Sequence, residues 1–156
     1  MNIDIKTDGE QGTKRLQQKF TTLAGNVKNL RGLMKRIGID LLNEVSLNFD
    51  NEGNEGNQWT PLKAATIARR RNKIKETIGI LHDSGDLRRS FVPDSDDTTV
   101  RVGSPVTYSI FHEEGSDKIP KRKMLPTQRR GLEIAIDVTE RYVDEKIREA
   151  ALRGTE

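Results

Sequence analysis

Residues 16–45, LQQKFTTLAGNVKNLRGLMKRIGIDLLNEV, decide the fold of this chain. Their large apolar side chains recur at steps of three and four residues: Leu16, Phe20, Leu23, Val27, Leu30, Met34, Ile37, Leu41 and Val45. That spacing places all nine on one stripe of a helix, which we predict to run from Thr13 to about Phe49. Each glycine in it disfavours the helix by about 1 kcal/mol, so we expect a bend near Gly25 or two consecutive helices. The stripe packs either on the chain's own sheet or against another subunit.

Weaker patterns on either side of this stretch indicate an α+β fold. Residues 2–6 alternate polar and apolar side chains, which predicts a short strand before the helix. Residues 50–58, DNEGNEGNQ, form a polar, glycine-rich loop that we expect to be flexible. Thr60 can cap a further helix and Pro61 suits its first position, so we predict a helix to about Arg71.

The second half of the chain predicts a small antiparallel sheet and a long C-terminal helix. Residues 91–92 and 98–102 favour strands, and PDSDD between them supplies the turn. Residues 106–111 add either a third strand or a helical turn. The last helix begins at Pro126 and runs to about Arg153. Its buried face is predicted from helical spacing: Leu132, Ile136, Thr139, Val143, Ile147 and Ala150.

The composition indicates a single domain, residues 1–156, with a small core. Apolar residues make up 33% of the chain, where about half is usual, and charged residues make up another 33%. We expect this core to be small, or to be completed by a partner that covers an apolar helix face. A subunit that gains stability from assembly fits this expectation better than a self-sufficient enzyme. The absence of cysteine excludes disulfides and thiolate chemistry. No apolar run approaches the roughly 20 residues of a membrane span, and no signal peptide is evident, so we expect a soluble protein made in a cytoplasm.

The net charge of +3 is modest, but the charges are unevenly distributed. Basic residues gather in residues 63–75 and 118–130, and acidic residues in 94–97 and 113–114. Three interpretations stay open: a solvated mixed surface, phosphate binding, and charge matching between neighbouring subunits. Charge matching gives eight candidate interface residues: Arg69, Arg70, Arg71, Lys121, Arg122, Lys123, Glu113 and Glu114. The basic loop 118–123 is the candidate docking element, and a merely solvated loop is the alternative.

Residues that could carry chemistry are few. His82 and His112 each stand beside a carboxylate, but neither has a second histidine three or four residues away, as a metal site on a helix requires. Ser84 lies in SGD and not in a nucleophile elbow, so a hydrolytic triad of Ser84, His112 and Asp86 is not indicated. Glycine-rich phosphate-binding motifs are absent. We therefore predict no catalytic residue, no metal and no cofactor.

Four motifs follow one another from the middle of the chain to the start of the last helix. They are WTPLKAAT at 59–66, ILHDSGDLRRSF at 80–91, VGSPVTYSIFHEEG at 102–115 and IPKRKMLP at 119–126. In this order and spacing the chain resembles the phage virion morphogenesis proteins, the family of the phage Mu G protein and related tail-completion proteins. Two positions depart from the usual family pattern. Ser109 stands where alanine is usual, and Met124 stands where an aromatic residue is frequent.

The resemblance implies a non-enzymatic structural protein of the virion. Its expected role is to complete the tail or join it to the filled head, as a symmetric ring at the neck that is assembled in the host cytoplasm. Expected partners are further copies of the chain and the neighbouring head-completion and tail-terminator or tail-tube proteins, with DNA nearby in the channel and no membrane. The alternative is a nucleic-acid-binding protein that uses the basic residues 63–75 and 118–130.

The residues of these motifs suit a scaffold. Ten of them are either glycines at expected turns and strand ends or residues with large side chains: Trp59, Leu62, Leu81, Gly85, Leu87, Phe91, Gly103, Tyr108, His112 and Gly115. We expect the six that are neither glycine nor histidine to form a core. Gly85 makes its turn sharp, and Gly103 lets the end of a strand approach another backbone closely.

Overall fold

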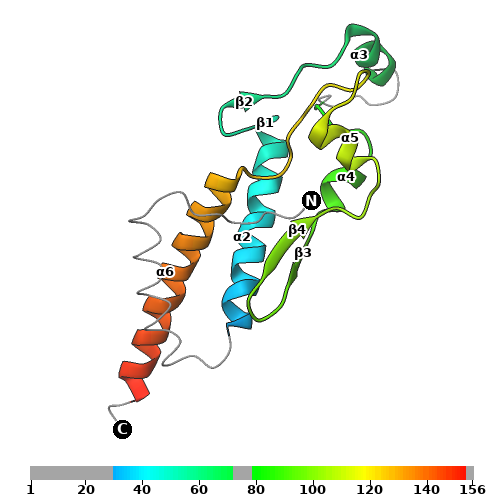
Figure 1. The fold of residues 1–156 in the computed structure, drawn as a ribbon. Helices are drawn as coiled ribbons and strands as arrows, with labels where there is room; N and C mark the ends of the chain where they lie inside the picture. The colour runs from blue at the N-terminus through cyan, green and yellow to red at the C-terminus, as the bar shows by residue number, and fades with distance from the viewer. Residues whose placement is uncertain (1–29, 72–78, 154–156) are drawn as a thin grey trace. The chain divides into compact units, whose positions relative to one another are not determined.

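The computed structural model of the protein describes residues 30–71 and 79–153 (Figure 1). The expected strand at 2–6, the bend near Gly25 and the first four residues of the apolar stripe lie outside them. The chain divides into two compact units. The first unit takes in the chain as far as Leu41, Pro93–Arg101 and the residues from Gln128 onward, and the second takes in Leu42–Val92 and Val102–Thr127. That the chain forms one domain stays a prediction.

The helices and strands confirm the α+β class. They are α2 (Arg31–Asp50), β1 (Gly53–Asn54), β2 (Asn57–Gln58), α3 (Ala64–Arg71), α4 (Asp86–Arg89), β3 (Val92–Ser95), β4 (Val100–Gly103), α5 (Ser109–Glu114) and α6 (Gln128–Arg153). The strands pair as two small antiparallel hairpins, β1 with β2 and β3 with β4. The long helices α2 and α6 stand near the two ends of the described chain, as the sequence predicts.

Several boundaries differ from the sequence-based expectations. Within the expected loop 50–58, residues 53–58 form the β1–β2 hairpin, whose turn residues Glu55 and Gly56 both have positive φ angles, as a type I′ turn between antiparallel strands requires. The expected flexibility of this loop stays a prediction. The helix expected at Pro61 begins at Ala64 instead, and the Lys63 carbonyl accepts its first backbone hydrogen bonds. Residues 109–114 form the helix α5, so the helical interpretation of this region holds.

The β3–β4 turn is held by one aspartate. Asp96 Oδ1 accepts hydrogen bonds from the backbone N–H groups of Thr98 and Thr99, both at 2.8 Å. These two bonds lower the pKa of Asp96. Because a short carboxylate can close such a turn on its own backbone, the acidic PDSDD sequence favours the hairpin.

In the first unit, the N-terminal half of α2 runs antiparallel to α6 (Figure 1). Small residues let the elements approach closely: a Cβ on Gly38 would lie 3.1 Å from Pro93 and 3.2 Å from Val100. On α2, the stripe residues Met34, Ile37 and Leu41 are buried, as predicted.

The buried face of α6 is only partly the predicted one. Thr139 and Val143 are buried, but Ile147 is 58% exposed, and Leu132 and Ile136 are half-buried. Five further residues of α6 are buried, Gly131, Ile134, Ala135, Val138 and Tyr142, and of these Gly131 and Tyr142 lie against Leu41 and Gly32 of α2. The expectation left out the small residues Gly131 and Ala135, which close packing of two helices places on the buried face. Thr139 fits there because its hydroxyl donates to the Ala135 carbonyl within the same helix.

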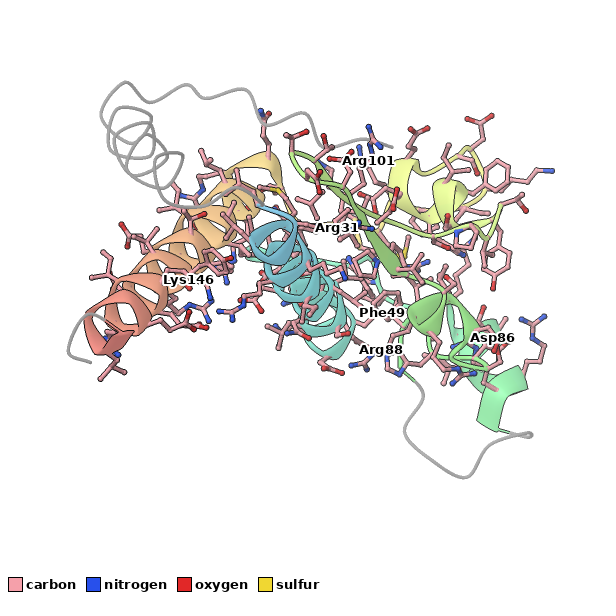
Figure 2. All side chains as sticks on the ribbon, turned by 90° about the horizontal axis from the view of Figure 1, so that it is seen from below. Arg31, Phe49, Asp86, Arg88, Arg101 and Lys146 are labelled. Carbon is pink, nitrogen blue, oxygen red and sulfur yellow. The ribbon has the colours of Figure 1, made fainter. Side chains whose placement is uncertain are left out.

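An aromatic cluster forms the core of the second unit. Phe49 is 1% exposed, and its ring centroid lies 5.4 Å from Trp59 and 6.1 Å from Phe91, both in edge-to-face geometry. Figure 2 marks Phe49 on α2 and Arg88 on α4. Arg88 donates two hydrogen bonds to the Asp50 carboxylate, at 2.6 and 2.9 Å, which tie α4 to the end of α2. The fourth motif contacts this cluster through Trp59.

Candidate functional site

Residues 122–125, within the fourth motif, run through the second unit as neither helix nor strand. Three side chains from other parts of the unit donate to successive carbonyl oxygens: Trp59 Nε1 to Lys123 (2.9 Å), Asn48 Nδ2 to Met124 (2.9 Å) and Asn54 Nδ2 to Leu125 (2.6 Å). Side chains thus replace the partner strand that such buried backbone would otherwise need. We call residues 122–125 the clamped segment.

Glu113 supplies the matching acceptor for the clamped segment. Its Oε2 accepts the backbone N–H of Met124 at 2.7 Å and that of Leu125 at 3.2 Å. Glu113 is 6% exposed, and burial raises the pKa of its carboxyl, although the two N–H groups oppose that shift. The expectation that Glu113 belongs to an acidic interface is therefore wrong. Its neighbour Glu114 is exposed and stays a candidate.

Arg122 also turns inward. Its Nε and Nη2 both donate to the Thr60 carbonyl, at 3.1 and 2.9 Å, and its backbone N–H donates to the His112 carbonyl at 2.7 Å. It is 6% exposed, and burial, followed by nearby Arg70, lowers its pKa. Arg122 is thus not an exposed docking residue, because its side chain binds the Thr60 carbonyl in the segment before α3. Lys121 and Lys123 are exposed.

The three consecutive arginines of α3 have different positions. Arg69 is exposed, as an interface residue should be. Arg70 is half-buried, and its Nη1 donates to the Gly79 carbonyl at 3.0 Å. The side chain of Arg71 lies outside the described residues. Arg70 is therefore engaged within the unit, and Arg69 is the exposed cation of this pair.

The six expected core residues divide into three groups. Trp59, Leu87 and Phe91 are buried, and Leu62 and Leu81 are half-buried. Tyr108 is 45% exposed, so its assignment to the core is wrong. It precedes α5 and meets only the edge of His112 among the described rings, with centroids 6.4 Å apart. A tyrosine next to a short surface helix can keep its hydroxyl in water without a buried partner.

The glycines of the motifs also have different roles. Gly85 and Gly115 have φ angles of 78° and 79°, a conformation that disfavours other residues. A Cβ on Gly115 would lie 3.0 Å from the Lys121 backbone nitrogen, so this glycine permits a close approach of two chain segments. Gly103 has no such neighbour within 4 Å among the described residues, so the close approach expected there stays a prediction.

Exposed apolar side chains gather on the outer side of α5. Tyr108, Ile110 and Phe111 are 45%, 50% and 51% exposed, and we call these three residues the α5 patch. On the same short helix, the Glu113 side chain and the His112 backbone carbonyl face the clamped segment. Sequence reasoning did not identify this patch, although helical spacing from the acidic pair would have placed Ile110 and Glu114 on one face.

The residues considered for chemistry, His82, Ser84, Asp86 and His112, all lie among the described residues. The described part of the chain contains no group of three or more histidine, aspartate or glutamate side chains that could hold a metal ion. Ser84 donates to Asp86 at 2.5 Å and thereby closes its own turn before α4. None of the helices in the described ranges is long and apolar enough to cross a lipid bilayer.

Comparisons with known proteins identify the family. No curated protein and no solved structure matches the chain. The phage virion morphogenesis family matches residues 11–144, a span that includes all four motifs and the side chains that hold the clamped segment. The match covers far more than half of the chain, so the protein belongs to the phage virion morphogenesis family and has a structural or morphogenetic role in a phage virion.

Proposed function

We propose that the protein is a non-enzymatic subunit that completes the tail and joins it to the filled head, as a symmetric ring at the neck of the virion. The observation that carries this proposal is the use of the motif residues. The side chains of Trp59, Glu113 and Arg122 form hydrogen bonds with backbone groups of the second unit. These bonds fix the position of the helix that carries the exposed α5 patch. A rigid frame with an exposed apolar surface favours docking over chemistry.

The virion is the expected place of this docking. The family match supports a virion-associated protein, and the head–tail junction is where a tail-completion protein would act. The expected neighbours are further copies of the chain on either side and head-completion and tail-terminator or tail-tube proteins above and below. A binding surface that only a finished neighbour offers would make this subunit act late in assembly.

Nucleic-acid binding through residues 63–75 and 118–130 loses support from the described side chains. Arg70 and Arg122 donate to carbonyl groups of the second unit and are not free to contact phosphates. Among the described residues of these two segments, exposed cations remain at Lys63, Arg69, Lys118, Lys121, Lys123 and Arg129. They can lie near DNA in the channel, but no observation favours DNA as the main partner.

A phage that lacks this gene tests the role. We expect filled heads and complete tails to accumulate without stable joined particles, as judged by electron microscopy of the lysate. Empty heads, or tails that never polymerise, would place the protein at an earlier step and contradict the proposal. The mass and symmetry of the protein in extracted necks would test the ring.

The exposed lysines of the basic loop allow a second test. The double variant Lys121→Ser/Lys123→Ser removes two exposed cations and leaves Arg122 in place. We expect a folded protein, by circular dichroism, that joins heads to tails less efficiently. Normal joining by this variant would remove the docking role of the loop. Arg122→Ser serves as the contrast, because we expect it to destabilise the subunit itself.

A further inference from the structure

The α5 patch is unusual for so short a helix in a chain that is poor in aromatic residues. The whole sequence contains seven aromatic residues, and two of them, Tyr108 and Phe111, are about half exposed beside Ile110. Aromatic residues at exposed positions are enriched in the centres of protein interfaces. The patch therefore calls for a partner, and the chemistry around it indicates which one.

The frame behind the patch positions it before any partner binds. Glu113, on the inner side of α5, accepts two backbone hydrogen bonds from the clamped segment. His112 accepts a third from the Arg122 backbone through its carbonyl. Bonds on one side of a helix orient the side chains on the other side, which reduces the entropy lost on docking.

A complementary surface exists on α3 of the same unit. Its small side chains Ala64, Ala65 and Ala68 are exposed, and Arg69 is exposed beside them. We call these four residues the α3 face. Alanines leave room for large apolar side chains, so this face fits the α5 patch in size.

The charges of the two surfaces also match. Glu114 and Asp117 are exposed at the end of α5 and just beyond it. On α3, Arg69 is exposed, and Lys63 is exposed directly before the helix. Because the exposed Lys118 follows Asp117 and offsets its charge, the match rests on Glu114 beside the large apolar residues and Arg69 beside the small ones, whose opposite charges attract each other.

We propose that the α5 patch of one copy of this chain docks on the α3 face of a second copy. This inference rests on the proposed ring and names the surfaces that would form it. When two copies join through two different surfaces, one copy keeps a free α5 patch and the other a free α3 face. Further copies can bind there, so the contact repeats from copy to copy and can close into a ring. If two α5 patches faced each other instead, the Glu114 side chains of the two copies would come close together. The repulsion between their like charges disfavours that arrangement.

The size of the contact explains when it forms. A helix of eight residues is about 12 Å long, so two such short helices bury well under the roughly 1,000 Å² of a stable interface. The free protein is then monomeric at ordinary concentrations. The ring closes where a finished neighbour holds several copies at once and raises their effective concentration.

Cysteine crosslinking in particles tests the contact, because the natural chain contains no cysteine. Ala68→Cys and Phe111→Cys are produced together in cells infected with the deletion phage, and one copy carries an epitope tag that shifts its size. After mild oxidation of purified particles, we expect a mixed dimer of tagged and untagged chains on a non-reducing gel. Particles with either variant alone should give none. A dimer from Phe111→Cys alone would show a contact between like patches, and a crosslink to another virion protein would show a different occupant. Either result overturns the proposal.

A charge exchange gives an independent readout if the cysteine variants enter particles poorly. Arg69→Glu and Glu114→Arg should each lower the infectious titre by at least about tenfold, because each places like charges at the contact. The double variant should recover most of the loss, because the attraction is restored with opposite signs. Failure of the double variant to recover overturns the α3–α5 contact. The phenotype of the deletion phage is unaffected by that failure, so the joining role is judged separately.

Discussion

Each of the two units has its own kind of stabilising polar contact. In the first unit, ion pairs link α2 and α6 across exposed surface: Arg36 with Glu145, and Arg141 with Asp40. The second unit also has an exposed ion pair, Arg88 with Asp50, but around the clamped segment its polar contacts are buried and join side chains to backbone, as those of Asn48, Asn54 and Glu113 do. Two paired helices satisfy their own backbone, whereas an irregular buried segment depends on side chains for that purpose.

The difference teaches where the protein is sensitive to substitution. An exposed ion pair contributes about 0–1 kcal/mol because water competes for both charges. A buried N–H or carbonyl that loses its partner costs about 1–3 kcal/mol because nothing replaces the bond. Changes of the same chemical type should therefore have unequal effects in the two units.

The largest effect is expected at Trp59. Trp59→Ala removes a side chain that is 5% exposed, its contact with Phe49 and its hydrogen bond to Lys123, which together cost about 3–5 kcal/mol. Urea unfolding followed by circular dichroism measures this loss. Trp59→Phe, which keeps a ring but not the donor, should lose less. A loss below about 0.5 kcal/mol for Trp59→Ala would show that the cluster does not support the second unit.

Two adjacent glutamates offer a matched test of burial. Glu113→Ala leaves the N–H groups of Met124 and Leu125 without an acceptor, which should cost about 2–4 kcal/mol in unfolding free energy. Glu114→Ala, next in the chain but exposed, should change it by less than about 0.5 kcal/mol. Equal effects of the two substitutions would mean that the clamped segment is not held by Glu113.

A smaller effect should appear as a pH dependence of the same group. Burial raises the pKa of Glu113 in the folded protein, so the folded state holds the proton more tightly than the unfolded state does. The protein should lose stability as pH rises from the ordinary glutamate value, about 4.3, through the raised pKa. Glu113→Gln keeps an acceptor oxygen and does not titrate. Its stability relative to the natural protein should therefore increase over that pH window, as measured by urea unfolding at each pH. A relative stability that decreases would mean that the two N–H groups outweigh burial.

The smallest effect is expected in the first unit. Arg36→Gln removes the exposed ion pair with Glu145, in which two guanidinium nitrogens of Arg36 donate to the Glu145 carboxylate, one of them at 2.9 Å. The cost should be about 0.2–1 kcal/mol and should shrink as salt is added. A double-mutant cycle with Glu145→Gln isolates the pair from other effects of each substitution. A coupling above about 2 kcal/mol would remove the contrast between the two units.

Local patterns made the helices predictable. The burial of Met34, Ile37 and Leu41 follows from spacing along one helix, and the β3–β4 turn follows from the aspartates of PDSDD. Such signals lie within a few residues of each other and need no knowledge of the rest of the fold. The four motifs likewise gave the family, because their order is a property of the sequence itself.

The contacts of the clamped segment were not predictable from the sequence. Glu113 and Glu114 are chemically identical neighbours, and only packing decides which of them is buried. Arg122 stands between two exposed lysines and looks like one more surface cation. Asn48 and Asn54 gain their roles from a segment more than seventy residues away, with separations of 76 and 71 residues. No periodicity links positions so far apart.

These long separations have a consequence for the protein during its synthesis. The apolar stripe of α2 leaves the ribosome well before the clamped segment, whose partners Asn48 and Asn54 precede it by 76 and 71 residues. Until then, Phe49 and Trp59 have no complete core to enter, and the nascent chain carries them uncovered. Native contacts between such distant residues also slow folding, because a large loop must close first. We therefore expect ribosome-bound chains that stop before Met124 to be protease-sensitive and to recruit chaperones, while chains long enough to expose Leu125 begin to acquire protection.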